Sequence, residues 1–336
     1  MLILGISPFY LECMMLKTNI LIIKRVLLLS IFVFTFCIIK GQQTPLSSIS
    51  YWVFTPYIYN PAIVGSKDYL SIGVNAAFQG KSNTQLISGN ARFSKTKSGY
   101  FSSPDIIEFK NIGIGGSVFK DISGLSHNIG LSTAFSYQVP LNTRELSFLS
   151  FGVSLKGVHN TLDSDSGELV NAAKNTFYPN LDLGIYYYGT NFFTGFSTIN
   201  MFGSPRRSSG LGAYKVPVSK QYFFTAGYKV LLSKSLNIVL EPSVLIFAND
   251  STFSNISHNI SPIIKVYMEE FCFGTSFHSN GKISFFSQFR YPRFYVGVFY
   301  ELPKKTPYFK SSPIVEFTVG LNIQTDKSRL SNHSHW

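Results

Sequence analysis

The chain has little charge and little cysteine. Charged side chains make up 14% of its 336 residues, fewer than the 16% that are aromatic. Two of its three cysteines, Cys13 and Cys37, precede residue 42, so Cys272 has no cysteine partner in the rest of the chain. The sequence after residue 41 therefore excludes a disulfide framework, and its fold must be stabilised in another way.

Residues 1–41 predict a signal peptide. Basic residues precede an apolar run from Val26 to Ile39, and Ile39 and Gly41 suit positions −3 and −1 of a cleavage site. Met15 is a plausible start of translation, because the residues before it add nothing to this signal-peptide pattern. The alternative is an N-terminal membrane anchor, but the apolar run is shorter than the ~20 residues that a spanning helix needs. We therefore expect an exported protein.

Long apolar runs are missing after residue 41. The longest candidate, Ile238 to Ala248, is interrupted by Glu241 and Pro242, which excludes an α-helical membrane protein. The formal net charge of +12 is not gathered into a stripe of lysine and arginine. Such a balance fits an anionic membrane surface, and we expect no nucleic-acid partner.

Period-2 alternation is present instead. Between His127 and Val139, Ile129 and Phe135 share one face with other large side chains, whereas Gly130 and Ser132 share the opposite face with other small and polar ones. The polar face carries few charges, unlike the solvent face of a soluble sandwich. A lumen lined by small polar residues and a lipid-facing apolar surface are typical of a membrane barrel.

We therefore predict an all-β fold, a transmembrane antiparallel β-barrel of about fourteen strands, over residues 69–324. A periplasmic or plug segment (42–68) precedes it, and a tail (325–336) follows. Twelve or sixteen strands are the alternatives. The predicted strands are 69–79, 84–94, 110–120, 127–139, 145–157, 179–188, 191–199, 220–232, 235–248, 260–268, 270–279, 281–290, 292–301 and 312–323.

Connection lengths predict the orientation of this barrel. With a periplasmic N-terminus, the long connections 158–178, 200–219, 249–259 and 302–311 face outward, as is usual in outer-membrane barrels. The long connection 95–109 is an exception on the periplasmic side. Aromatic clusters at strand ends, such as Tyr186–Tyr188 and Tyr222–Phe224, predict interfacial girdles, with core packing as the alternative.

Motifs that carry chemistry are scarce. The sequence shows no nucleophile or zinc motif, and we predict no catalytic residue, no cofactor and no metal site. His278 and Glu241 are the weak candidates for catalysis on an inward face. Asp163 and Asp165 depart from a calcium-loop spacing, so a solvated loop is the alternative. The candidate partner-binding residues of the outer loops are Asp163, Asp165, Arg206, Arg207 and Lys215.

The stretch YWVFTPYIYNPAIVGS, residues 51–66, does not alternate like a strand, and its prolines are expected to break any helix. Together with stretches at 178–197, 221–247 and 312–323, it resembles the PorP/SprF family of the type IX secretion system, although Thr55 departs from the family pattern. The residues that carry this N-terminal resemblance are Tyr51, Phe54, Pro56, Asn60, Pro61, Ala62 and Gly65.

The resemblance implies a non-enzymatic protein of the outer membrane that assists secretion or surface attachment of a large adhesin-like cargo, including gliding adhesins. Its expected partners are that cargo, other secretion components and outer-membrane lipid. In this setting residues 51–66 are expected to plug the lumen, with Thr55 and Asn60 extended before the prolines; a flexible lead-in is the alternative. A porin or small-solute transporter, an outer-membrane enzyme and a soluble β-sandwich adhesin are the rival functions.

Overall fold

The computed structural model describes residues 49–67, 69–95, 110–124, 126–142, 146–162, 175–202, 220–249, 259–279, 281–291, 293–303 and 312–324. All of them belong to one unit, residues 41–336. The predicted signal peptide, the C-terminal tail and the candidate loop residues (Asp163, Asp165, Arg206, Arg207 and Lys215) lie outside the described residues.

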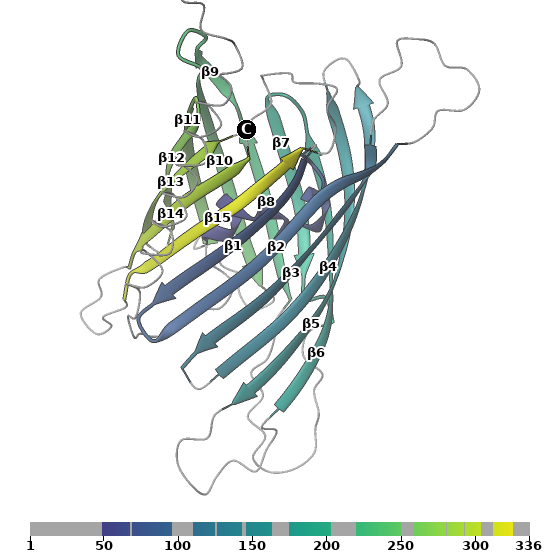
Figure 1. Cartoon of the computed structure of the whole chain (residues 1–336), viewed down its shortest axis with the longest axis vertical. Helices are drawn as coiled ribbons and strands as arrows, with labels where there is room; N and C mark the ends of the chain where they lie inside the picture. The colour runs from purple at the N-terminus through teal and green to yellow at the C-terminus, as the bar shows by residue number, and fades with distance from the viewer. Residues whose placement is uncertain are drawn as a thin grey trace, which may run out of the picture. The chain divides into compact units, whose positions relative to one another are not determined.

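The described residues form a closed antiparallel barrel of 14 strands, which confirms the predicted fold (Figure 1). The ring closes where β1 pairs with β15, with Val74 opposite Val319. The first elements are α2 (Ile49–Phe54), η1 (Pro56–Ile58), η2 (Pro61–Ile63), β1 (Tyr69–Gln79), β2 (Ser82–Lys95), β3 (Lys110–Ser123), β4 (Ser126–Asn142), β5 (Ser147–Leu162), β6 (Asn175–Tyr188) and β7 (Phe192–Ile199). The remaining strands are β8 (Gln221–Tyr228), β9 (Val230–Ser233), β10 (Ile238–Asn249), β11 (Ile260–Met268), β12 (Phe271–Phe277), β13 (Ile283–Tyr291), β14 (Phe294–Leu302) and β15 (Ile314–Gln324).

Strands β8 and β9 together make one crossing of the barrel. Both pair with β10, and they are separated only by Lys229, whose backbone N–H donates to the carbonyl of Asn191 at 2.7 Å. Every predicted strand is present, and the strands differ from the prediction mainly at their ends. For example, β5 continues to Leu162, beyond the predicted end at residue 157. Boundaries shift in this way because a ladder continues for as long as its partner strand does.

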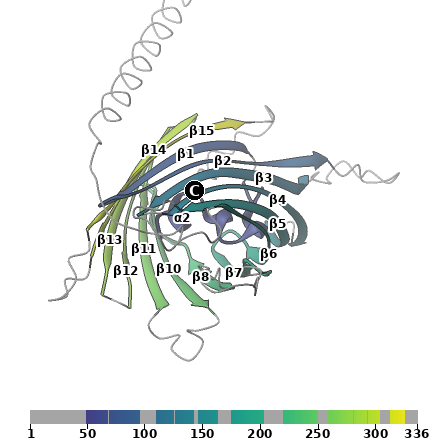
Figure 2. The same ribbon diagram turned by 90° about the horizontal axis from the view of Figure 1, so that it is seen from below.

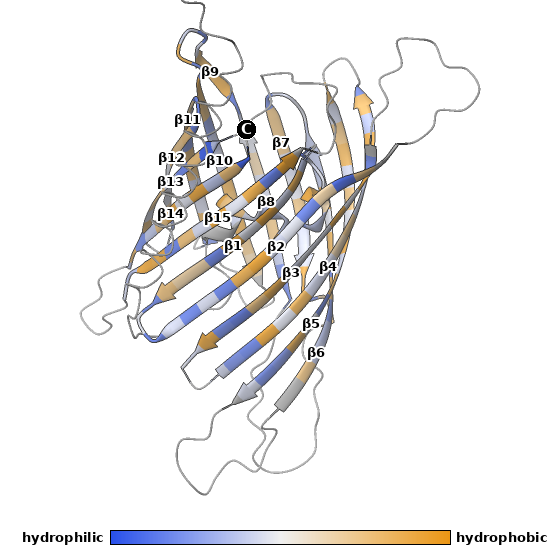
Figure 3. Ribbon diagram, viewed as in Figure 1, coloured by the Kyte–Doolittle hydropathy of each residue, from blue (hydrophilic) through white to orange (hydrophobic). Residues whose placement is uncertain are grey.

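The two faces of each strand meet different surroundings, as the alternation predicted. On β4, Ile129, Leu131 and Phe135 are exposed on the outside, whereas Ser136 and Gln138 are fully buried on the inside. Hydropathy alternates along the strands in the same way (Figure 3). The outer surface is therefore apolar, and the lumen is lined by hydroxyls, amides and glycine, as in membrane barrels.

Most of the long connections lie at one end of the barrel, and the exception is 96–109, between β2 and β3, at the other end. At the end where the chain enters β1 and leaves β15, the connections 189–191, 234–237, 269–270 and 292–293 are short. At the opposite end, 163–174, 200–220, 250–259 and 303–313 are long. By the usual asymmetry of outer-membrane barrels, the end near the termini is periplasmic. No described helix has the length and apolar character needed to cross a membrane.

The predicted aromatic girdles are only half right. Tyr187 and Phe192 pack together with ring centroids 6.0 Å apart, and Phe192 is exposed on the outer surface. By contrast, Phe193, Phe223 and Tyr295 are buried in the lumen. Adjacent residues of one cluster point to opposite faces because the side-chain period of a strand is two. Each cluster therefore divides between the girdle and the interior.

Candidate functional site: the segment inside the barrel

Residues 49–66, here called the inner segment, lie within the ring of strands (Figure 2). The segment consists of α2 and two 3-10 turns, so the expectation of a non-helical stretch is wrong. Pro56 and Pro61 each stand in the first turn of a 3-10 helix. A proline is tolerated there because the first N–H groups of a helix have no acceptor within it.

Asn60 connects the two turns. Its backbone is extended (φ −138°, ψ 103°), as predicted for a residue before proline, and its Oδ1 accepts from the N–H of Ala62 at 3.0 Å. Its Nδ2 donates to the carbonyl of Ile185 on β6 at 3.1 Å. Thr55 has the same φ but a ψ of 58°, so the expectation of an extended Thr55 is not met. Asn60 thus both caps a turn and attaches the segment to the wall.

The barrel wall supplies donors for the backbone carbonyls that such short turns leave open. Ser150 on β5 donates to Ala62 O at 2.6 Å, and Ser136 on β4 donates to Val64 O at 2.6 Å. Two further donors are Gln138 to Val64 O at 3.1 Å and Ser197 to Tyr59 O. Strands β4, β5 and β7 therefore hold the segment by its main chain, an attachment that does not depend on the identity of its side chains.

Glycines let the segment approach the wall closely. Gly152 on β5 and Gly184 on β6 face each other across the ladder, and a Cβ on either would overlap the segment, at Ala62 and Asn60 respectively. Gly65 adopts a left-handed φ of 67°. A Cβ added to Gly65 would overlap the Cα of Gly113 on β3. Only glycine combines that φ with so close an approach of two backbones.

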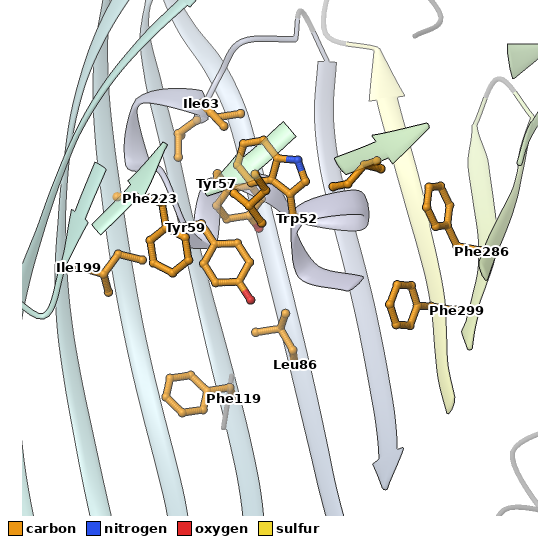
Figure 4. Close-up of a cluster of buried hydrophobic side chains, with 14 of the residues drawn as sticks. Trp52, Tyr57, Tyr59, Ile63, Leu86, Phe119, Ile199, Phe223, Phe286 and Phe299 are labelled. Carbon is orange, nitrogen blue, oxygen red and sulfur yellow. The ribbon is translucent and has the colours of Figure 1, made fainter. Parts of the chain in front are cut away.

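Aromatic side chains of the segment fill the lumen (Figure 4). Trp52, Tyr57 and Tyr59 are buried, and the Tyr59 ring centroid lies 4.8 Å from that of Phe223 on β8. On the opposite wall, the ring of Phe54 lies against Gly297 of β14. Burial raises the pKa of the Tyr57 and Tyr59 hydroxyls far above the ordinary value, so both stay neutral. The segment therefore bridges the barrel from β3–β7 to β14.

Two cavities flank the inner segment. The periplasmic chamber has a volume of about 180 Å³ and is lined by Trp52, Pro56 and Ile63 of the segment. The outer chamber, of about 320 Å³, is lined by Ile58 and Tyr59. Only Tyr57 of the segment lines both. The segment therefore separates two compartments of the lumen.

A family model for the type IX secretion system membrane protein PorP/SprF matches residues 40–321. The chain belongs to this family. A closed barrel with a lipid-compatible outer face, in a family of secretion-system membrane proteins, identifies an outer-membrane protein. No curated protein matches the sequence.

Solved structures of outer-membrane barrels resemble this PorP/SprF protein in fold. CymD, a monoaromatic hydrocarbon channel, is 12% identical (TM-score 0.40), over 82% of this chain and 92% of its own. The KdgM porin is 11% identical (TM-score 0.34), over 76% and 99%. BamA from Haemophilus ducreyi, lacking POTRA domains 1–3, is 8% identical (TM-score 0.35), over 76% and 71%. Likenesses of this size carry no argument about function.

The residues that carried the family resemblance coincide with the contacts of the inner segment. Asn60, Ala62 and Gly65 are the residues that meet the glycines of the wall, and Phe54 meets Gly297. The two prolines begin the 3-10 turns. Tyr51 lies in α2. The sequence alone does not single out the donors Ser136, Ser150 and Ser197, because small polar residues recur on every inward face of this PorP/SprF protein.

The two weak candidates for catalysis do not meet. Glu241 accepts from Lys265 and Tyr267, each at 3.0 Å, inside the periplasmic half of the barrel. His278 lies beyond the outer end of β12, where its Nδ1 is 2.7 Å from Ser261 Oγ. Burial lowers the pKa of His278. Within the described ranges, no group of three or more His, Cys, Asp or Glu is placed to hold a metal ion.

Loss of the two hydrogen bonds of Asn60 is expected to destabilise the inner segment by an amount that amide exchange can measure. In the Asn60→Ala variant we expect the amides of Ala62 and Val64 to exchange with deuterium about five- to thirtyfold faster, which corresponds to a loss of ~1–2 kcal/mol. Exchange mass spectrometry in detergent micelles measures this. Asn191→Ala, in an exposed turn, is the control and should leave both amides unchanged. Equal exchange in the two variants would show that Asn60 does not hold the segment.

Proposed function

We propose that this protein is a non-enzymatic outer-membrane component that assists secretion or surface attachment of a large adhesin-like cargo protein. Family membership supports the link to secretion. The single observation that carries the proposal is the inner segment, which occupies the lumen and is bound by its main chain to β4, β5 and β7 and by the Asn60 side chain to β6. A barrel closed in this way suits a scaffold or anchor better than a route for solutes.

The surface expected to bind the cargo is the set of long outer connections, 163–174, 200–220 and 250–259. They contain acidic Asp163 and Asp165 and basic Arg206, Arg207 and Lys215. Charged residues on exposed loops steer association with a complementary partner. The other expected partners, further secretion components, would meet the protein at its periplasmic end or within the membrane.

A deletion strain tests the proposal. We expect one large protein to disappear from the cell surface, since a dedicated barrel has no substitute for its cargo. Surface biotinylation with quantitative mass spectrometry measures this, and affinity purification from detergent-solubilised outer membrane should recover the same protein. A wild-type copy is expected to restore the surface protein, whereas a copy with Arg206, Arg207 and Lys215 changed to serine is expected to restore less. An unchanged surface proteome in the deletion strain contradicts the proposal.

The rival function is a porin or small-solute transporter. Its support is the 14-stranded barrel itself, because barrels of this size have room for an aqueous channel when the lumen is empty. The two functions make opposite predictions for the conductance of the intact protein.

A further inference from the structure

The periplasmic chamber carries an unequal charge. Among its described lining residues are four cations, Lys67, Lys229, Lys265 and Arg290, and one carboxylate, Glu241. The outer chamber has the opposite balance, with Lys156 against Asp121 and Asp182 among its described lining residues. The two compartments of the lumen therefore differ in the charge of the ligand that each would attract.

The single carboxylate of the periplasmic chamber is already shared. Glu241 lies 3.0 Å from Lys265 Nζ and 3.9 Å from Lys229 Nζ, and it also accepts from the Tyr267 hydroxyl. One negative charge thus faces two positive ones at short range. The charges of Lys67 and Arg290 come in addition, on other elements of the same chamber.

Lys67 follows the inner segment directly. Its ammonium lies 5.7 Å from the ring centroid of Tyr69 and the side chain is solvent-exposed. Arg290 and Lys229 place two further positive charges around the same chamber. A bound anion would relieve this repulsion between cations.

Neutral donors complete the chamber. The tyrosines Tyr57, Tyr69 and Tyr295 and the amides Asn90, Gln288 and Asn322 line it. Its volume is about 180 Å³, many times the minimum that a single bound water requires. That space accommodates a phosphate ion, or a carboxylate with the adjoining part of a peptide, together with a little water.

We propose that the periplasmic chamber is a binding site for a compact oxyanion, a carboxylate or phosphate group that enters from the periplasmic side. Lysine and arginine are the side chains that hold such groups through charge-assisted hydrogen bonds. The ligand chemistry has two sources, a free inorganic anion or a carboxylate of a protein that docks on the periplasmic end, and the two are separated by the probes below.

Trp52 provides the measurement, because it lines the chamber and the only other tryptophan is Trp336. In a Trp336→Phe background, the purified full-length barrel in detergent is titrated with sodium phosphate and, separately, with an acidic tetrapeptide. We expect a saturable change in Trp52 fluorescence with at least one probe, and calorimetry on the same samples detects binding that leaves the fluorescence unchanged. A blocked neutral tetrapeptide should have no effect.

The charge dependence identifies the site. Lys67→Gln combined with Arg290→Gln is expected to weaken oxyanion binding at least about tenfold, because two of the charged donors of the chamber are removed. Lys81→Gln, at an exposed turn of the opposite end, removes a positive charge outside the chamber and should leave the affinity unchanged. Binding of phosphate alone assigns a free anion, and tighter binding of the acidic peptide assigns a protein carboxylate.

The inference is overturned if neither probe binds by fluorescence or calorimetry, or if the chamber variant and Lys81→Gln bind equally well. Both measurements use the purified protein and involve neither cargo nor secretion. Failure of the anion site therefore leaves the proposed role in secretion standing, and an unchanged surface proteome in the deletion strain leaves the anion site standing.

Discussion

Deleting residues 51–65 is expected to convert a closed barrel into an ion-conducting pore. The deletion removes the buried rings of Trp52, Tyr57 and Tyr59 and the carbonyls that Ser136, Ser150 and Ser197 hold. What remains is a lumen lined by hydroxyls and amides, which water can enter, in a barrel of 14 strands. In planar bilayers, conductance per inserted molecule should rise by roughly tenfold or more over that of the intact protein.

The control for this experiment removes a shorter stretch of chain, of ten residues, after the last strand. Deleting residues 327–336 should leave conductance at the level of the intact protein, and heat-dependent gel migration should show both deletion variants folded as barrels. A large conductance of the intact protein would contradict the closed-lumen interpretation and favour the porin. Equal, low conductance of the intact and deleted proteins would show that residues 51–65 do not seal the lumen.

Placing a side chain at Gly152 is expected to displace the inner segment while leaving the barrel intact. The Cβ of Gly152→Ala would overlap the backbone of Ala62. Because β5 is held in its ladders on both sides, the segment is the part that must move. Overlap of this kind costs ~1–3 kcal/mol, and the larger side chain of Gly152→Val should cost more. In the Trp336→Phe background, Trp52 fluorescence should shift to longer wavelength as that ring enters water, and conductance should increase.

Gly89→Ala on β2 is the matched control. An added Cβ there meets its nearest neighbour, the Ser71 carbonyl oxygen, at 3.7 Å, an ordinary contact. It therefore tests the general cost of replacing a strand glycine without touching the segment. If Gly152→Val and Gly89→Ala give the same fluorescence and the same low conductance, the close approach at Gly152 does not position the segment.

Much of the fold is predictable because it depends on local order in the sequence. The period of two specifies strands, and the chemistry of the two faces specifies lipid outside and a polar lumen. The pairing partners follow almost automatically, since each strand in an up-and-down barrel pairs with its neighbours in sequence. The division of β8 and β9 at Lys229 was not predicted, because it reflects a local break in pairing with β10.

The site is predictable only in outline. The prolines and Asn60 indicate a segment of unusual conformation, but they do not predict that it contains helical turns. The glycines at 152 and 184 look like any other small residues of an inward face until their Cα atoms are seen against Ala62 and Asn60. Likewise, Lys67, Lys229 and Arg290 are far apart in sequence, and their gathering at one chamber depends on the closure of the ring.

By itself, the sequence determined that the chain crosses a membrane as a barrel and that a proline-rich aromatic stretch precedes the first strand, because both features are written in spacing and residue type. The tertiary structure decided where that stretch goes and what it touches. Its contacts join residues far apart in the sequence, such as Tyr59 and Ser197, which are 138 positions apart. Only the curvature of a closed sheet brings such groups within hydrogen-bonding distance.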